Sequence, residues 1–114
     1  MKIYVDGSGW NGRKSEYCVV AGEKIIRKQL AEKKTNNEME YAALLEAFAI
    51  AKKGDIILTD SQLVHGQVCK GWKVNYEHLK PLVAKAKKLL AEKKLVLEWI
   101  PREENKAGQI LEKH

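Results

Sequence analysis

The feature that most restricts the possible folds is a short apolar run at residues 55–60, with the sequence Asp-Ile-Ile-Leu-Thr-Asp. A short and nearly unbroken run of this kind is typical of a strand buried on both faces, as in a parallel sheet. Helical periodicity precedes it at residues 37–50 and follows it at residues 77–92. Strands joined through helices run parallel, with the helices packed on the sheet. The order of these patterns therefore predicts an α/β fold.

Other segments complete the predicted sheet. Gly7-Ser8-Gly9 ends the first strand, Gly22 turns the chain between two strands as in a hairpin, and a helical tail is expected from about residue 105 to the end. A short helix is expected over residues 61–67. We predict a mixed five-stranded sheet with helices on both faces, formed by residues 1–114 as one domain. The segments with strand patterns, besides the buried run, are 2–6, 16–21, 24–30 and 95–100.

Three acidic residues lie where predicted elements begin or end. Asn37 is a good N-cap residue for the first long helix, and Glu40 follows three residues later, which is the spacing of a capping box. Asp6 and Asp60 follow predicted strands, where aspartate is common in turns. Each residue taken alone therefore has an ordinary structural explanation.

Taken together, Asp6, Glu40 and Asp60 have a second explanation. In open α/β sheets the ligand crevice lies outside the carboxyl ends of the parallel strands, where both aspartates are expected. Carboxylates packed closely repel one another unless a cation neutralises them, and a hard divalent ion with oxygen ligands does so. Mg²⁺ or Mn²⁺ is the natural occupant of such a site.

The composition is compatible with a nucleic-acid partner but does not require one. The net charge is +6, and lysines that face phosphates gain affinity by releasing condensed counterions. Lysine and glutamate can equally form surface ion-pair networks. We find no apolar run of about 18 residues and no apolar signal-peptide core, so we expect a cytoplasmic location and no membrane contact. Cys18 and Cys69 lack metal-ligand spacing, and we expect both to be reduced.

Four segments resemble, in order, the signature blocks of type I ribonuclease H. The resemblance runs through essentially the whole chain, and it is closest to the short forms that lack the basic protrusion and an added N-terminal hybrid-binding domain. It implies a ribonuclease H-like fold. The four segments are 5–8 (VDGS), 35–43 (TNNEMEYAA), 59–62 (TDSQ) and 99–105 (WIPREEN).

The resemblance also implies a catalytic mechanism. The family holds two metal ions with an Asp-Glu-Asp-Asp set, and its first three positions correspond to Asp6, Glu40 and Asp60. In such two-metal sites one ion activates water and the other stabilises the leaving oxygen of a phosphodiester. By analogy, Asp6 would contact both ions, and Glu40 and Asp60 would serve the leaving-group side.

The fourth carboxylate of the family pattern is missing. It should follow the signature residue Asn105 by four positions, where this chain has Gln109. Glutamine can contact a cation through its carbonyl oxygen but brings no charge, and it can also be an ordinary helix residue. Three nearby acidic residues could substitute for the missing ligand, namely Glu103, Glu104 and Glu112.

The same resemblance suggests substrate contacts. Thr35 matches a phosphate-pocket residue, and Asn36, Asn37 and Gln62 match side chains that reach the minor groove, where 2′-hydroxyls distinguish RNA from DNA. The charged and aromatic trio Lys70, Trp72 and Lys73 could hold the DNA backbone, although Trp72 could equally pack on the sheet. Ser8 and Asn105, which lie within signature blocks, complete the candidate substrate-binding residues. The histidines have no partner pattern, and we assign no chemistry to His65, His78 or His114.

We therefore expect a metal-dependent endonuclease that hydrolyses the RNA strand of RNA–DNA hybrids and uses two Mg²⁺ or Mn²⁺ ions. Gln109 makes a second hypothesis necessary: a catalytically inactive module that binds nucleic acid without cleaving it. A third is a related nuclease that acts on another nucleic-acid structure. Neither the sequence nor the resemblance requires a protein partner.

Overall fold

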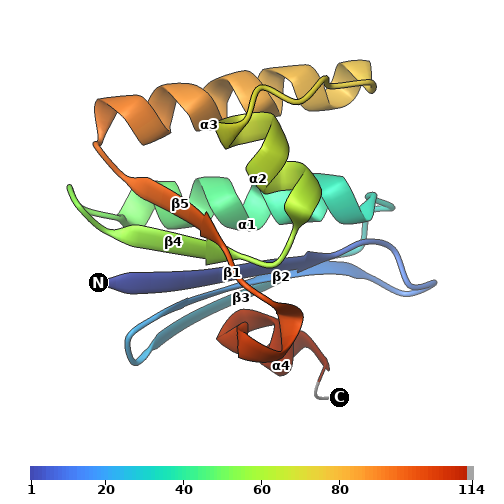
Figure 1. The fold of residues 1–114 in the computed structure, drawn as a ribbon. Helices are drawn as coiled ribbons and strands as arrows, with labels where there is room; N and C mark the ends of the chain where they lie inside the picture. Colours follow the sequence, from blue (N-terminus) through green and yellow to red (C-terminus); the bar gives the residue numbers. More distant parts are fainter. Residues whose placement is uncertain (113–114) are drawn as a thin grey trace.

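The computed structural model describes residues 1–112, which form five strands and four α-helices, with two short 3-10 segments (Figure 1). No helix among these residues is long and apolar enough to span a bilayer. In chain order the elements are β1 Lys2–Ser8, β2 Ser15–Ala21, β3 Lys24–Leu30, α1 Asn36–Ile50, β4 Ile56–Thr59, α2 Gln62–Cys69, η1 Glu77–Leu79, α3 Lys80–Glu92, β5 Val96–Trp99, η2 Arg102–Glu104 and α4 Lys106–Glu112. His114 and the end of the predicted tail lie outside the described residues.

The strands form one mixed sheet in the order β3-β2-β1-β4-β5. β1 pairs with β2 and β2 with β3 in antiparallel fashion, whereas β1, β4 and β5 are parallel. The buried run at the centre of the sequence is β4, which lies between β1 and β5 with hydrogen-bonded neighbours on both sides. The predicted mixed five-stranded sheet is confirmed.

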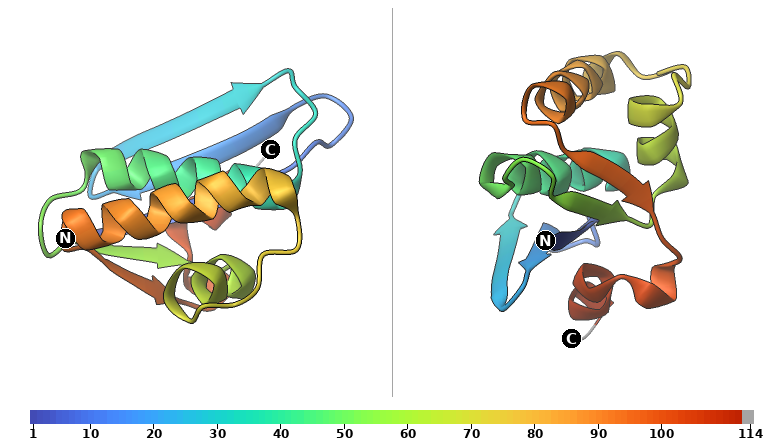
Figure 2. Two further views of the ribbon diagram at one scale, coloured as in Figure 1. Left: turned by 90° about the horizontal axis from the view of Figure 1, so that it is seen from above. Right: turned by 60° about the vertical axis from the view of Figure 1, so that its left-hand side comes forward.

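Helices cover both faces of the sheet, as predicted (Figure 1). On one face α1 packs on β1 and β2, while α2 packs on β4 and β5. α3 contacts α1 and α2, so it forms an outer layer on that side (Figure 2). On the opposite face α4 alone packs on β1 and β2. The main core lies between the sheet and the three helices on the first face, and a small second core under α4 consists of Cys18, Val20, Ala107 and Leu111.

The start of α1 differs from the sequence prediction. Thr35 is the N-cap, in an extended conformation: its Oγ1 accepts the Glu38 amide hydrogen at 3.1 Å, and Glu38 Oε1 accepts the Thr35 amide at 3.0 Å. The predicted box of Asn37 with Glu40 is wrong. Two overlapping segments satisfy the same capping pattern, and the earlier one forms. Glu40 consequently lies beyond the first turn, where its carboxylate takes no part in capping.

The end of β1 also differs. The strand does not stop before Gly7, because β2 continues to pair with it through Asp6↔Cys18, Gly7↔Tyr17 and Ser8↔Glu16. The parallel pairing with β4 ends earlier, at Val5↔Thr59. β1 and β4 therefore separate at Asp6, inside a strand rather than after one, and the separation opens beside Asp60.

Candidate active site

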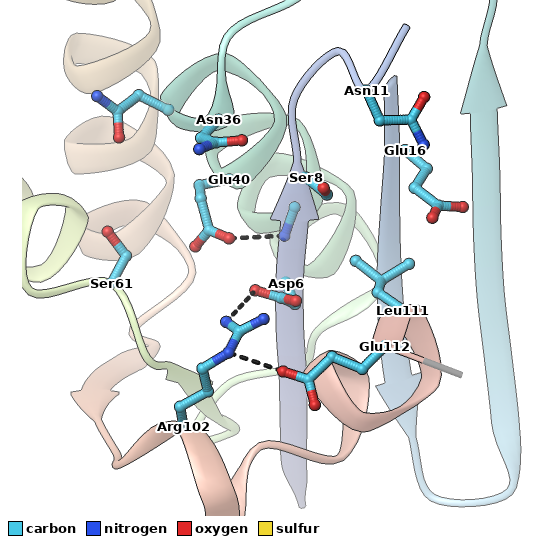
Figure 3. A pocket seen from close by; sticks show the side chains of 12 residues that line it. Asp6, Ser8, Asn11, Glu16, Asn36, Glu40, Ser61, Arg102, Leu111 and Glu112 are labelled. Atoms are coloured by element: carbon cyan, nitrogen blue, oxygen red, sulfur yellow. Dashed lines mark hydrogen bonds and ion pairs between the residues drawn. The ribbon is translucent and has the colours of Figure 1, made fainter. Parts of the chain in front are cut away.

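Three carboxylates meet where β1 and β4 separate. Asp6 comes from β1, and Glu40 reaches toward it from α1 (Figure 3). Asp60 directly follows β4. One oxygen of each carboxylate lies within 4.8 Å of one oxygen of each of the other two. The convergence predicted from the sequence is therefore observed, whereas the role of these residues as metal ligands remains a prediction. Asp6 and Glu40 also line a cavity of about 550 Å³.

Gly7 allows Glu40 to approach β1. A Cβ atom at position 7 would lie 2.2 Å from the backbone carbonyl carbon of Met39 and 2.4 Å from the Glu40 nitrogen, which is closer than atoms can pack. With no side chain there, the Gly7 amide donates a hydrogen bond to Glu40 Oε1 at 2.6 Å. The backbone of β1 thus orients the Glu40 carboxylate toward Asp6.

Asn105 holds the third carboxylate in place. Its side chain is fully buried, and its Nδ2 donates to Val5 O at 2.9 Å and to Asp60 Oδ2 at 2.8 Å. Its Oδ1 accepts amide hydrogens from Ala107 at 3.0 Å and Gly108 at 3.4 Å at the start of α4. Asn105 was predicted to contact substrate, but its side chain has no exposed surface that a substrate could reach. The residue instead caps α4 and orients Asp60.

We expect Asn105→Ala to lower the free energy of unfolding by about 2–4 kcal/mol, because each buried polar group left without a partner costs about 1–3 kcal/mol. Urea denaturation measures the loss. Asn75→Ala is the matched control: Asn75 is exposed, and a surface change of this kind should cost no more than about 0.5 kcal/mol. Equal stability of the two variants would contradict the role given to Asn105.

Hydrogen bonds compensate the negative charge of the buried carboxylates only in part. Asp6 is 2% exposed and Glu40 is 7% exposed, yet Asp6 Oδ1 and Glu40 Oε2 are buried with no hydrogen-bond partner. Burial raises the pKa of Asp6, and the Asp60 charge adds to the effect, while hydrogen bonding with Glu40 opposes it. Burial also raises the pKa of Glu40 well above its ordinary value, and hydrogen bonding and repulsion with Asp6 act in the same direction. Facing carboxylates of this kind bind a proton or a cation to remain together.

A divalent metal ion fits this donor set. All the donors are carboxylate oxygens, which hard ions such as Mg²⁺ prefer, and two of the oxygens accept no hydrogen bond. Asp6, Glu40 and Asp60 are the residues that could hold it. These residues therefore form an acidic triad that could bind a metal ion.

Arg102 is a residue of this site that the sequence reasoning missed. Its Nη1 lies 3.9 Å from Asp6 Oδ1, and its Nε donates to Glu112 Oε1 at 2.8 Å (Figure 3). The same Nη1 lies 3.6 Å from Asp60 Oδ2. Arg102 is the one basic residue in the segment 99–105, which was a signal that could have singled it out. Its guanidinium places a positive charge beside two carboxylates of the triad.

The predicted substrate residues divide into two groups, of which the first surrounds the triad. Ser8, Asn36 and Asn37 line the same cavity as Asp6. Asn36 and Asn37 also line a neighbouring cavity of about 350 Å³ together with Thr35. These four residues therefore form a continuous polar surface beside the triad.

The second group lies away from the triad cavity. Gln62 is exposed at the start of α2, and the cavity is lined there by its neighbour Ser61. Trp72 packs its indole against Gly66, where a Cβ would lie 2.1 Å from the ring, and stays 44% exposed. Lys70 Nζ lies 5.9 Å from the same ring centroid. Lys73 lines a different hollow with two lysines of α3, Lys80 and Lys87.

Gln109 does not enter the triad cavity. Its side chain is exposed, and its Nε2 donates to the backbone carbonyl of Glu103 at 2.9 Å. In this conformation it cannot act as the fourth member of the catalytic set, so the structure does not support that prediction. The part of α4 that faces the carboxylates is Gly108, where a Cβ would lie 3.3 Å from Asp6 Oδ2.

The strand order, the helices on both faces and the triad at the separation of β1 and β4 are those of a ribonuclease H-like protein. A family model described as RNase H matches residues 1–108. The chain belongs to the RNase H family.

Named relatives agree with this membership. The Bifunctional protein Rv2228c of Mycobacterium tuberculosis is 32% identical over 119 residues, which cover 92% of this chain and 33% of that protein. The chain thus spans about a third of the length of the curated relatives it matches.

Solved structures agree as well. LC11-RNase H1, isolated from compost by a metagenomic approach, is 27% identical with a TM-score of 0.80, covering 96% of this chain and 90% of that one. The same protein in complex with an RNA/DNA hybrid is 25% identical with a TM-score of 0.74, covering 96% of this chain and 91% of that one.

Proposed function

We propose that this chain is a metal-dependent endonuclease that hydrolyses the RNA strand of RNA–DNA hybrids, with two Mg²⁺ or Mn²⁺ ions bound in the presence of substrate. The observation that carries the proposal is the meeting of Asp6, Glu40 and Asp60, with two buried carboxylate oxygens that accept no hydrogen bond. Membership of the RNase H family and the hybrid complex of LC11-RNase H1 support the choice of substrate.

The triad and its hydrogen-bond partners have separate roles in the proposed reaction. The bound ions would supply an activated water and stabilise the charge that develops on the leaving oxygen. Asp6, Glu40 and Asp60 would hold the ions, while the Gly7 amide and the Asn105 side chain keep Glu40 and Asp60 oriented. This division of roles keeps the carboxylates fixed before substrate arrives.

Substrate recognition is assigned to the polar surface beside the cavity. Ser8, Asn36 and Asn37 line it and offer hydroxyl and amide groups that can hydrogen-bond 2′-hydroxyls in a minor groove. Thr35 lines the adjoining cavity, and we assign it the contact with a backbone phosphate. Lys70, Lys73 and Trp72 lie farther along the chain after α2, and contact with the DNA strand there remains a prediction.

The test is a strand-labelled RNA–DNA hybrid incubated with the protein in Mg²⁺ or in Mn²⁺. We expect internal cleavage of the RNA strand in at least one ion and none in EDTA. Single-stranded RNA, duplex RNA and duplex DNA serve as controls and should be cut more slowly. No cleavage in either ion at high protein concentration would contradict the proposal.

A second candidate function is favoured by two observations. Gln109 turns away from the triad, and Arg102 lies 3.6 Å from Asp60, as expected if the chain binds nucleic acid without cleaving it. Hybrid binding that weakens steeply with salt, without any turnover, is the result that would favour this alternative.

A further inference from the structure

The face of α4 that looks toward the triad begins at Gly108. A Cβ at this position would lie 3.3 Å from Asp6 Oδ2 and 3.6 Å from Asp60 Oδ2. Residues four apart lie on one face of a helix, so Gly108 shares this face with Glu112. Gln109 belongs to another face, where its amide bonds the Glu103 carbonyl.

The side chain of Glu112 can cover the space that Gly108 leaves open. Helical side chains tilt toward the helix N-terminus, so a residue covers the surface one turn before its own Cα. Glu112 lines the same cavity as Asp6 and Glu40 (Figure 3). The glycine at position 108 therefore gives a long side chain from the next turn access to the carboxylates.

Arg102 already occupies the place of a cation between Glu112 and the triad. Its guanidinium contacts Glu112 at 2.8 Å, Asp60 at 3.6 Å and Asp6 at 3.9 Å. Three carboxylates thus surround one positive charge. Arg102 and Glu112 both have half-exposed side chains, at 56% each, so the arginine can move into solvent without unfolding any part of the chain.

Other acidic residues fit this position less well. Glu103 and Glu104 are exposed in η2 and do not line the cavity. Glu16 does line it, but its Oε2 already accepts hydrogen bonds from Arg27 and from Gln29. Glu112, by contrast, lines the cavity and pairs with Arg102, the same half-exposed arginine that contacts Asp6 and Asp60.

We propose that Glu112, rather than the residue at position 109, supplies the fourth carboxylate of the metal centre, and that a divalent ion displaces Arg102 to bind it. The inference rests on the proposed function for the existence of that metal centre. A divalent ion neutralises two charges where the guanidinium neutralises one, so the exchange favours the ion among four carboxylates.

Direct Mn²⁺ binding, followed by electron paramagnetic resonance or calorimetry without substrate, tests the proposal. We expect Glu112→Gln to weaken Mn²⁺ affinity by about 10-fold or more, the size of loss found when a group that supports a metal site is removed. Glu103→Gln makes the same charge change on an exposed residue and should leave the affinity within about twofold, as expected for a screened surface charge. Arg102→Gln should strengthen binding, because it removes the competing cation.

The double variant Arg102→Gln/Glu112→Gln decides whether Glu112 acts on the metal or only on Arg102. If Glu112 is a ligand, its substitution weakens Mn²⁺ binding in the Arg102→Gln background as well. Loss of the effect in that background would overturn the proposal, and so would an unchanged affinity in the single variant Glu112→Gln or a wild-type chain that binds no Mn²⁺.

The hybrid assay keeps the two claims separate. If the wild type cleaves the hybrid and Glu112→Gln leaves the Mn²⁺ affinity unchanged, the nuclease function stands and only the role of Glu112 as fourth ligand is rejected. Weakened Mn²⁺ binding in Glu112→Gln without any hybrid cleavage by the wild type rejects the nuclease function and supports the ligand.

Discussion

Asp6→Asn is expected to remove high-affinity Mn²⁺ binding and to lower hybrid cleavage by at least about 10²–10³-fold, the loss seen when a preorganised charge-stabilising group is deleted. The substitution keeps the size of the side chain and removes its charge. Asp6 is the most buried of the three carboxylates, at 2% exposed, and one of its oxygens has no hydrogen-bond partner to compensate. Its charge is therefore expected to serve a bound cation and not the fold.

Thermal stability separates these two roles. A ligand that binds only the folded state raises stability with its concentration, by about 2.7 kcal/mol at one hundred times the dissociation constant. Mn²⁺ should therefore raise the Tm of the wild type and leave that of Asp6→Asn unchanged. Without metal the variant should be at least as stable as the wild type, because burial and the Asp60 charge raise the pKa of Asp6 and make its charged form unfavourable.

Asp55→Asn is the matched control for this experiment. Asp55 caps the turn after α1 by accepting the Lys52 amide at 2.8 Å, and it pairs with the N-terminal amine at 3.1 Å, so it has no contact with the triad. It should retain the full metal-dependent rise in Tm. A normal metal response in Asp6→Asn would contradict the assignment of the triad.

Gly7→Ala is expected to lower the free energy of unfolding by about 2–4 kcal/mol, which is at the upper end of the cost of adding a methyl group to a tightly packed site. The added methyl group would meet the backbone of α1 at 2.2–2.4 Å, and a backbone cannot move aside as a flexible side chain can. α1 must therefore move away from β1. The shift also breaks the 2.6 Å hydrogen bond from the Gly7 amide to Glu40, so Mn²⁺ affinity should fall together with stability.

Urea denaturation and Mn²⁺ titration measure the two losses. Gly12→Ala is the control, since a Cβ there has no atom within 4 Å and only its positive φ of 99° is unfavourable. Its cost should be about 1–2 kcal/mol, the penalty for a left-handed backbone, with no change in metal affinity. A Gly7→Ala variant as stable as the wild type would show that α1 and β1 are not held as close as described.

The sheet and its helices could be predicted because they follow from periodicity. The apolar run of β4 between two helical patterns required a parallel strand inside the sheet, and β4 lies between β1 and β5. The meeting of Asp6 and Asp60 followed from the same rule, since each directly follows Val5↔Thr59, the last residue pair of the parallel β1–β4 ladder. These features depend on the pattern of the chain and not on the conformation of any one side chain.

The errors arose where a local pattern had more than one solution. Thr35 with Glu38 and Asn37 with Glu40 both fit a capping box, and a sequence alone does not rank them. Asp6 was placed after a strand because Gly7 follows it, but pairing with β2 carries the strand through the glycine to Ser8. In both cases a partner distant in sequence decided the outcome.

The site residues that were missed depend on side-chain direction. Arg102 and Glu112 meet over the triad only because η2 and α4 turn the chain back on itself (Figure 1). Asn105 was predicted to contact substrate, whereas its side chain is buried and donates to the Val5 carbonyl of β1, a contact with a residue distant in sequence. Gln109 was identified by counting from Asn105, and counting does not give the rotamer that turns its amide to Glu103.

The small second core has a consequence for how the molecule opens. α4 is held to the sheet by four buried residues, Cys18, Val20, Ala107 and Leu111, whereas the opposite face has a core several times larger. Segments with few buried contacts undock at lower free energy than the rest of a protein, without global unfolding. Each such local opening withdraws Asn105 from Asp60, so the carboxylate geometry lasts only as long as this last helix stays docked.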